Sequence, residues 1–121
     1  LEEPSSYPAP TNKIPVKKEG DKGKFVLLDT NEINNIQSNG NTILIHTDTS
    51  LFTMQTTLDS MEKILGSTQF IRVHRTAIVN REKIVEIENL SNNEYQLKLK
   101  NGKKIWTGRK YAAAIQALLK I

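Results

Sequence analysis

Two Asn-Gly pairs, Asn39-Gly40 and Asn101-Gly102, constrain the fold of this chain most strongly, because each lies between two short apolar segments. Asn and Gly tolerate the positive φ angles of a two-residue hairpin turn, so each pair predicts two antiparallel strands joined by a tight turn. The neighbouring segments alternate apolar and polar residues with a period of two, most regularly over residues 95–99. This pattern favours a mainly β chain.

The same alternation predicts nine short strands, and Asn92-Asn93 marks a further turn between two of them. The predicted strands are Lys24–Leu28, Glu32–Gln37, Thr42–Thr47, Leu51–Met54, Phe70–His74, Thr76–Val79, Ile84–Ile87, Tyr95–Lys100 and Lys103–Thr107.

Two helices are also predicted, at about residues 57–65 and 109–120. Thr56 and Asp59 resemble a capping pair at the start of the first helix, and Gly66 can end it in the left-handed conformation. The second helix carries an apolar stripe with i, i+4, i+7 and i+8 spacing, formed by Tyr111, Ile115, Leu118 and Leu119. We interpret both as packing elements, because neither precedes the second amphipathic helix of a helix-turn-helix motif.

The first 13 residues differ from the rest of the chain, since they hold three of its four prolines, Pro4, Pro8 and Pro10. Such a segment buries too little apolar area to offset its ordering entropy. We therefore expect residues 1–13 to be a linker or free arm and residues 14–121 to be one domain. No apolar run reaches the ~18 residues of a membrane span, and the start lacks the features of a signal peptide. These observations predict a soluble, cytoplasmic protein without a membrane partner.

Positive charge is concentrated in the second half of the sequence. Residues 1–70 carry six Lys and Arg against nine Asp and Glu, whereas residues 71–121 carry eleven against four. A basic half indicates an acidic partner, such as nucleic acid or an anionic lipid surface. A solvated basic surface is the alternative.

The residues that perform catalysis or bind metals are scarce in this chain. It has no cysteine, which excludes disulfides and thiolate metal sites. Its two histidines, His46 and His74, belong to no HExxH motif, and GxSxG, Walker and GxGxxG motifs are absent. His46 lies in an apolar strand and is interpreted as structural. We therefore predict no enzyme activity, no cofactor and no metal site.

The most distinctive segment runs from Phe70 to Asn80 and places three basic side chains between two apolar strand fragments. Arg72 and His74 alternate with apolar residues, so they share one face of a regular strand. Arg75 then falls at the strand end or in the turn, where its planar fork can bind a guanine edge or a phosphate. The alternative is a surface ion pair of these cations with Glu82 or Glu86.

Two further groups could contact nucleic acid. Arg109 and Lys110 follow Gly108 at the junction of the last strand and last helix, where helix amides and a cation together suit a phosphate or a base edge. Asn39 and Asn41 lie at a predicted hairpin tip, and Asn can pair with the N6 and N7 atoms of adenine. Taken alone, these residues are also consistent with an ordinary loop cation and with plain turn chemistry.

The segment Phe70–Asn80, followed by Ile84, resembles the F-x-R-x-H-R-S-x-x-V-N signature of the LytTR DNA-binding family, with Thr76 in place of the commoner Ser. The resemblance covers roughly Lys13 to the C-terminus. Ile36–Asn41 resembles the family hairpin I-E-A-x-G-N-Y. Thr107–Tyr111 resembles its closing S-R-R/K-Y, in which Gly108 replaces Ser and removes that hydroxyl.

This resemblance implies an elongated, mainly β fold of about ten short strands with two short helices, whose loops read DNA in successive major grooves. Carried over by position, the base-contacting candidates are Arg75, Arg109 and either Asn41 or Asn39. The candidates for contacts to the DNA backbone, or for support, are Arg72, His74, Asn80 and Lys110. The implied partner is double-stranded DNA, and no cofactor is implied.

Family members usually follow a phosphoacceptor receiver domain, so the resemblance predicts the output domain of a two-component response regulator. Because both helices are interpreted as core elements and no heptad seam is evident, we expect the isolated domain to be monomeric. The alternatives are a β-rich protein-interaction module and a module that binds RNA or single strands. The last would require exposed aromatic side chains, whereas Phe25, Phe52, Phe70 and Trp106 lie in predicted strands, where core packing is expected.

Overall fold

The computed structural model describes residues 12–18, 20 and 23–120 of the 121-residue chain. The described strands are β1 (Lys13–Lys18), β2 (Val26–Asp29), β3 (Asn35–Asn39), β4 (Thr42–His46), β5 (Leu51–Met54), β6 (Phe70–His74), β7 (Ala77–Asn80), β8 (Ile84–Ser91), β9 (Glu94–Leu99) and β10 (Lys104–Trp106). The described helices are α1 (Leu58–Leu65), α2 (Ala112–Leu119) and the 3-10 helices η1 (Thr30–Glu32), η2 (Arg81–Lys83) and η3 (Arg109–Tyr111). The prediction of a mainly β fold with about ten short strands and two short helices is confirmed.

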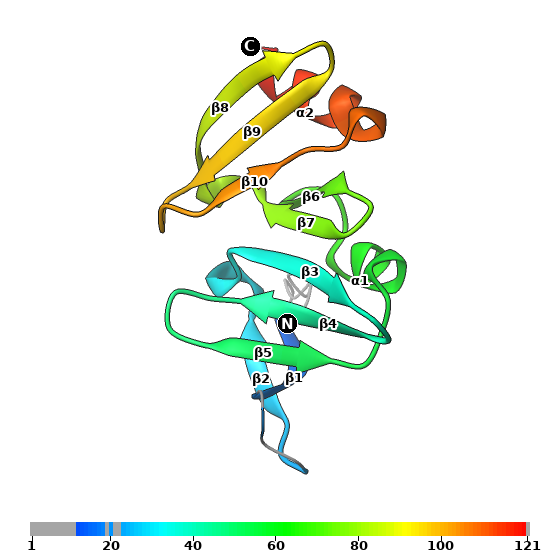
Figure 1. Ribbon diagram of the computed structural model, residues 1–121. Helices are drawn as coiled ribbons and strands as arrows, with labels where there is room; N and C mark the ends of the chain where they lie inside the picture. The colour runs from blue at the N-terminus through cyan, green and yellow to red at the C-terminus, as the bar shows by residue number, and fades with distance from the viewer. Residues whose placement is uncertain (1–11, 19, 21–22, 121) are drawn as a thin grey trace, which may run out of the picture.

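The strands form two antiparallel sheets. The larger has the order β2-β1-β5-β4-β3-β7-β6 and the smaller the order β10-β9-β8. Figure 1 shows the smaller sheet above the larger one in an elongated molecule, with the β6–β7 hairpin between them. Helix α1 lies beside this hairpin, and α2 packs against the smaller sheet and β6.

Both Asn-Gly pairs lie in tight hairpins, as predicted. In the β3–β4 hairpin Asn39 pairs with Thr42, so the two central turn residues are Gly40 and Asn41, one position later than the Asn-Gly pair itself. Gly40 has a φ of 65°, and a glycine at the first central position is typical of a type II′ turn. This turn places Asn41 at the tip of the hairpin.

Two hydrophobic cores meet at the β6–β7 hairpin. The first core joins the large sheet to Leu58 and Met61 of α1, and it includes Ile78 of β7. The second core joins β9 and α2 to Val79, the next residue of β7. Consecutive strand residues point to opposite faces, so one short hairpin contributes to both cores. Its position is therefore fixed from two sides.

The end of β7 is attached to the segment between η1 and β3 through Asn80, which is fully buried. Its side-chain amide donates to the Ile33 carbonyl at 2.9 Å, and its Oδ1 accepts from the Glu82 amide at 3.0 Å. Both polar ends of this buried side chain are thus paired, as burial of an amide requires. Asn80 stabilises the fold at this point.

Several predicted element boundaries are wrong. The sequence pattern does not predict β1 as a strand, because only Ile14 and Val16 alternate there and Pro15 lies between them. The predicted strand at Glu32–Gln37 begins later, since Glu32 belongs to η1. The predicted linker falls mostly on residues 1–11, which lie outside the described residues, so it stays a prediction.

The start of each helix also differs from the prediction. The N-cap of α1 is Thr57 rather than Thr56, and its side-chain oxygen accepts from the Ser60 amide at 3.1 Å. The predicted helix from Arg109 begins as η3 and becomes α-helical only at Ala112. None of the helices in the described part of the chain has the length and hydropathy that crossing a bilayer requires.

The expectation that the four strand-associated aromatics pack in the core is wrong for two of them. Phe52 and Phe70 are buried, but the side chains of Phe25 and Trp106 are 67% and 65% exposed. Phe25 precedes β2, and Trp106 lies on β10, an edge strand of the small sheet. An edge strand leaves one flank uncovered, which a periodicity pattern cannot reveal.

Replacing the observed cap residue should weaken the fold more than replacing its neighbour. We expect Thr57→Ala to lower the free energy of unfolding by about 1 kcal/mol, because the Ser60 amide loses its acceptor. Urea denaturation measures the change. Thr56→Ala is the matched control and should stay within about 0.5 kcal/mol of the parent. A larger loss of unfolding free energy for Thr56→Ala than for Thr57→Ala would show that Thr56 is the N-cap, as the sequence predicts.

Candidate nucleic-acid interface

Three loops lie next to one another along one edge of the molecule, on the right-hand side in Figure 1. They are the β3–β4 turn (residues 38–41), the β6–β7 turn (74–76) and the segment between β10 and η3 (108–110), together called the three-loop edge. The Ser38 amide donates to the Thr76 carbonyl at 3.0 Å, and the Gly108 amide donates to the Val73 carbonyl at 2.8 Å. These bonds attach both outer loops to the β6–β7 hairpin.

Arg75 occupies the turn of the β6–β7 hairpin, as predicted, and its side chain is exposed. The alternative of an ion pair with Glu82 or Glu86 is not observed for Arg75 or Arg72 within the described residues. Arg75 forms no ion pair with any residue of that part of the chain. Its guanidinium is therefore available to a ligand in front of the edge.

Arg72 supports this turn from behind. Its Nε donates to the His74 carbonyl at 2.8 Å and its Nη2 to the Arg75 carbonyl at 2.7 Å. Its Nη1 forms ion pairs with Asp59 at 2.9 Å and Glu62 at 3.0 Å, both on α1. A single guanidinium thus binds two consecutive carbonyls of the turn segment that carries Arg75 and attaches this segment to a helix.

The environment of Arg72 keeps it charged. Burial of its side chain, which is 12% exposed, disfavours the positive charge. Hydrogen bonds to Asp59 and Glu62 outweigh this effect and raise the pKa of the guanidinium above its ordinary value. The ring of Tyr111 lies 5.9 Å from the guanidinium carbon and adds a cation–π contact. Arg72 has the geometry of a structural support rather than of a DNA contact.

His74 joins the β6–β7 turn to the third loop. Its Nδ1 accepts from the Thr76 amide at 3.2 Å, and the Thr76 hydroxyl lies 2.8 Å from the same nitrogen. Gly108 packs closely on the other side, since a Cβ built there would lie 3.3 Å from Cδ2 of His74 and 3.4 Å from the Tyr111 ring. The glycine in this position permits a tight approach of the two loops.

Arg109 lies at the start of η3 with its side chain 73% exposed. Its Nε is 3.1 Å from Oε2 of Glu94, at the start of β9. Oε1 of the same carboxylate accepts from the Ser91 hydroxyl at 2.6 Å. Hydrogen bonds from Ser91 and Arg109 hold the pKa of Glu94 below its ordinary value, so the carboxylate is ionised at neutral pH. Lys110 is exposed beside this pair.

Asn39 and Asn41 are both exposed in the β3–β4 turn. The Asn39 carbonyl accepts from the Thr42 hydroxyl at 3.0 Å, which fixes the backbone of the turn. The two side-chain amides form no hydrogen bond with other described residues. Both residues therefore stay candidates for a base contact.

Two predicted residues lie away from the three-loop edge. Asn80 is buried at the end of β7 and has no access to a ligand. His46, interpreted as structural, is half-buried on β4, and its Nε2 lies 2.9 Å from the Gln37 amide oxygen. Burial and the nearby charge of Lys103 lower the pKa of His46, so it is neutral at pH 7.

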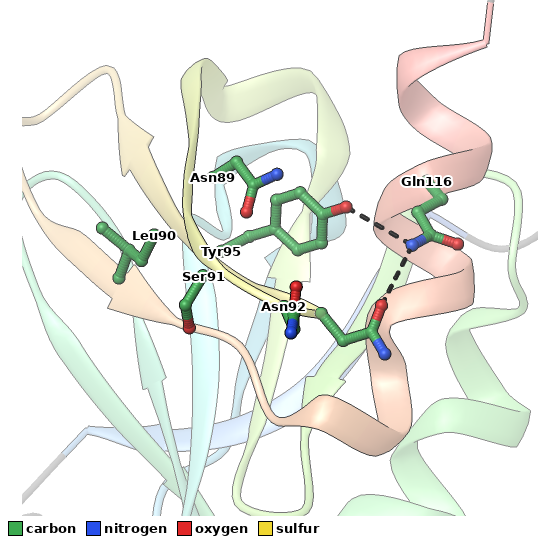
Figure 2. A pocket seen from close by; sticks show the side chains of 7 residues that line it. Asn89, Leu90, Ser91, Asn92, Tyr95 and Gln116 are labelled. Carbon is green, nitrogen blue, oxygen red and sulfur yellow. Dashed lines mark hydrogen bonds between the residues drawn. The ribbon is translucent and has the colours of Figure 1, made fainter.

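The cavity at the β8–β9 turn has no charged side chain in its lining. It has a volume of about 660 Å³ and lies where the side-chain amide of Gln116 donates to the Tyr95 hydroxyl and to Oδ1 of Asn93, both at 3.4 Å (Figure 2). Its lining is uncharged and mostly polar: Asn89, Leu90, Ser91, Asn92, Asn93, Tyr95 and Gln116. Within the described residues, no three His, Asp or Glu side chains gather as metal ligands.

Two features near the three-loop edge are not among the sequence predictions. The pairing of Arg109 with Glu94 joins residues that are 15 positions apart, and no local pattern signals it. Exposed Trp106 and the lysines Lys103 and Lys104 line a cavity of about 240 Å³ beside His74 and Thr76. The Lys-Lys-Ile-Trp sequence could have suggested a basic patch with an aromatic side chain.

Comparisons with known proteins agree with this architecture. The family model described as the LytTr DNA-binding domain matches residues 23–120. In fold the chain is similar to a solved LytTr DNA-binding domain from Bacillus cereus, with a TM-score of 0.80 and 20% sequence identity over 91% of this chain and 98% of that one.

Sequence relatives include the sensory transduction protein LytT of Bacillus subtilis (strain 168), 38% identical over 80% of this chain and 40% of its own length. The transcriptional regulatory protein LytR of Staphylococcus aureus (strain N315) is 32% identical over 78% of this chain and 38% of its own length. The chain thus spans about two fifths of the length of these curated relatives.

Replacing the guanidinium of Arg72, which holds the turn of Arg75, should destabilise the domain. We expect Arg72→Lys to lower the free energy of unfolding by about 2 kcal/mol, because one ammonium cannot replace bonds to two carbonyls and two carboxylates. Urea denaturation measures it. Arg81→Lys is the matched control, since Arg81 makes one side-chain bond, to the Thr68 carbonyl, and its loss should be within about 0.5 kcal/mol. Equal losses would contradict the supporting role of Arg72.

Proposed function

The chain belongs to the LytTR DNA-binding domain family, and we propose that it binds double-stranded DNA in a sequence-specific manner to regulate transcription. In this proposal it is the output domain of a two-component response regulator. Its loops read base edges in the major groove, which alone presents a distinct pattern for each base pair.

The observation that carries the proposal is the shared placement of Arg75 and Arg109. Both are exposed, and Arg75 lies in the turn of the β6–β7 hairpin. The bond from the Gly108 amide to the Val73 carbonyl attaches the loop of Arg109 to the same hairpin. Arginine forks read guanine O6 and N7 with two parallel bonds. The β3–β4 turn adds Asn41 or Asn39 as a reader of adenine. A rigid edge with three projecting loops can meet successive contacts on one face of a duplex.

Electrostatics and supporting contacts favour the same partner. Residues 71–121 carry eleven Lys and Arg against four Asp and Glu, and this half contains Arg75, Arg109 and Lys110. Lys110 is the candidate for a phosphate contact, while Arg72, His74 and Asn80 support the loops. Attraction of this kind supplies salt-dependent, sequence-independent affinity, and base contacts add the preference for a site.

The rest of the regulator is proposed from the relatives. The chain spans about two fifths of LytT from Bacillus subtilis. In this proposal a receiver domain precedes it, as the family resemblance implies. We propose that the whole protein is cytoplasmic and that the receiver domain controls its oligomeric state. The 121-residue chain, without that domain, is a monomer in this proposal.

Binding of single-stranded nucleic acid is a second candidate, favoured by one observation. Trp106 is 65% exposed beside Lys103 and Lys104, which is an arrangement that stacks bases next to a basic surface. We rank it second because only one such aromatic lies there, whereas successive bases need several stacking platforms.

The two base-reading arginines should control sequence preference. We expect Arg75→Ala and Arg109→Ala each to reduce the preference for the selected duplex over random duplex by roughly ten- to a hundredfold, because a bidentate guanine contact is lost. The duplex is recovered from a random pool with the parent protein, and affinities are measured by titration at fixed salt. Each variant is first shown to be folded by thermal melting.

Lys104→Ala is the control for these substitutions, since Lys104 is exposed on β10 and matches no family motif. It should weaken binding to both duplexes about equally, as loss of a phosphate contact does. A folded Arg75→Ala variant with the full preference of the parent would remove Arg75 from the base readers. The absence of any selected sequence would contradict sequence-specific binding.

Trp106 separates the two candidate functions, because it is the only tryptophan of the chain. We expect Trp106→Ala to leave the affinity for the selected duplex within about threefold, and single strands to compete poorly, since duplex bases remain stacked and paired. Competition titrations with each single strand measure this. Tighter binding of a single strand, lost in Trp106→Ala, would favour the second candidate.

A further inference from the structure

The guanidinium of Arg109 is held at only one of its three nitrogens. Its Nε donates to Oε2 of Glu94 at 3.1 Å, while Nη1 and Nη2 bind no other described residue. The side chain is 73% exposed, so the two terminal nitrogens face solvent beside the three-loop edge. One side of the fork is fixed, and the other side is open.

This arrangement suits a base reader. A guanine offers O6 and N7 to two parallel N–H groups of one arginine, and an arginine has five N–H groups in a fixed plane. A long exposed side chain loses rotamer freedom when it binds, and a bond that orders it beforehand reduces that loss. A carboxylate on Nε can fix the plane while Nη1 and Nη2 remain for the base.

Glu94 is itself held in place. Ser91 pairs with Glu94 across the β8–β9 turn, and its hydroxyl donates to Oε1 of the carboxylate at 2.6 Å. The next residue, Tyr95, is buried, and two bonds tie it to Thr107: Tyr95 N to the Thr107 hydroxyl at 3.2 Å, and Thr107 N to the Tyr95 carbonyl at 3.0 Å. These bonds join the two backbones one residue after Glu94, at Tyr95, and two residues before Arg109, at Thr107.

We propose that Glu94 is a positioning residue that orients Arg109 for base reading, with Ser91 fixing the carboxylate of Glu94. The inference rests on the proposed function, since it needs a duplex in front of the three-loop edge. It assigns a specificity role to an acidic residue at a surface that binds an acidic polymer. On charge alone, that carboxylate would only repel the phosphates.

The carboxylate of Glu94 should lower the affinity for any duplex through its charge but raise the preference for one sequence through Arg109. A test can separate these two effects because they have opposite signs. Affinities of the 121-residue chain are measured for the duplex recovered from a random pool and for random-sequence duplex. Glu94→Gln removes the charge, so affinity for random duplex should stay the same or rise. The preference for the recovered duplex should nevertheless fall about three- to tenfold, because the hold on Arg109 is weaker. Ser91→Ala should reduce the preference less and in the same direction.

Glu88→Gln is the matched control, because it removes the same charge from an exposed position on β8 that has no ion pair within the described residues. Its preference should equal that of the parent. In an Arg109→Ala background, Glu94→Gln should change the preference no further, since Glu94 acts through Arg109. Thermal melting of each variant shows that it is folded.

The remaining outcomes separate the inference from the proposed function. If Arg109→Ala loses the preference and Glu94→Gln keeps it, Glu94 does not position Arg109 and the function stands. If Glu94→Gln raises both affinities equally, Glu94 acts only as a charge and the inference is wrong. If Arg109→Ala keeps the full preference, the inference is also wrong, because Arg109 is no base reader. If the parent does not prefer any duplex, the proposed function fails first.

Discussion

The β6–β7 hairpin is buried on both faces, and the arrangement of the candidate DNA contacts depends on it. Ile78 packs into the core under the large sheet, and Val79 packs into the core shared with β9 and α2. The hairpin cannot shift by one residue without moving apolar side chains into the wrong core. Its turn, which carries Arg75, is thus held in one position, and the two outer loops are aligned by hydrogen bonds to the same hairpin.

Acidic residues close to the three-loop edge form ion pairs with basic ones. Asp59 and Glu62 hold Arg72 behind the turn, and Glu94 holds Arg109 at its Nε. Each carboxylate weakens the overall attraction to an acidic polymer but orders a guanidinium that could otherwise adopt many rotamers. Arg75 has no such partner within the described residues, so the two candidate base readers differ in how far they are ordered before binding.

Local patterns predicted much of the fold because hairpins are local. Gly40 provides the positive φ that its turn needs, and the position of Arg75 in a turn follows from two short strands on either side of it. Local patterns failed where the outcome depends on distant neighbours. Periodicity cannot distinguish Trp106, exposed on an edge strand, from Phe52 in the middle of a sheet. It also missed β1, whose hydrogen-bond partners include β5, far along the chain.

The sequence by itself determined the mainly β class, the hairpin turns, the basic second half and the motif that carries the family resemblance. Each of these features depends on residues that are close together in the chain. Only the tertiary structure decided that Arg72 supports the turn rather than extending from it, that Asn80 is buried, and that Arg109 pairs with Glu94. These roles depend on which carbonyls and carboxylates lie within hydrogen-bond distance. Residues far apart in sequence supply those partners, and only chain packing brings them together.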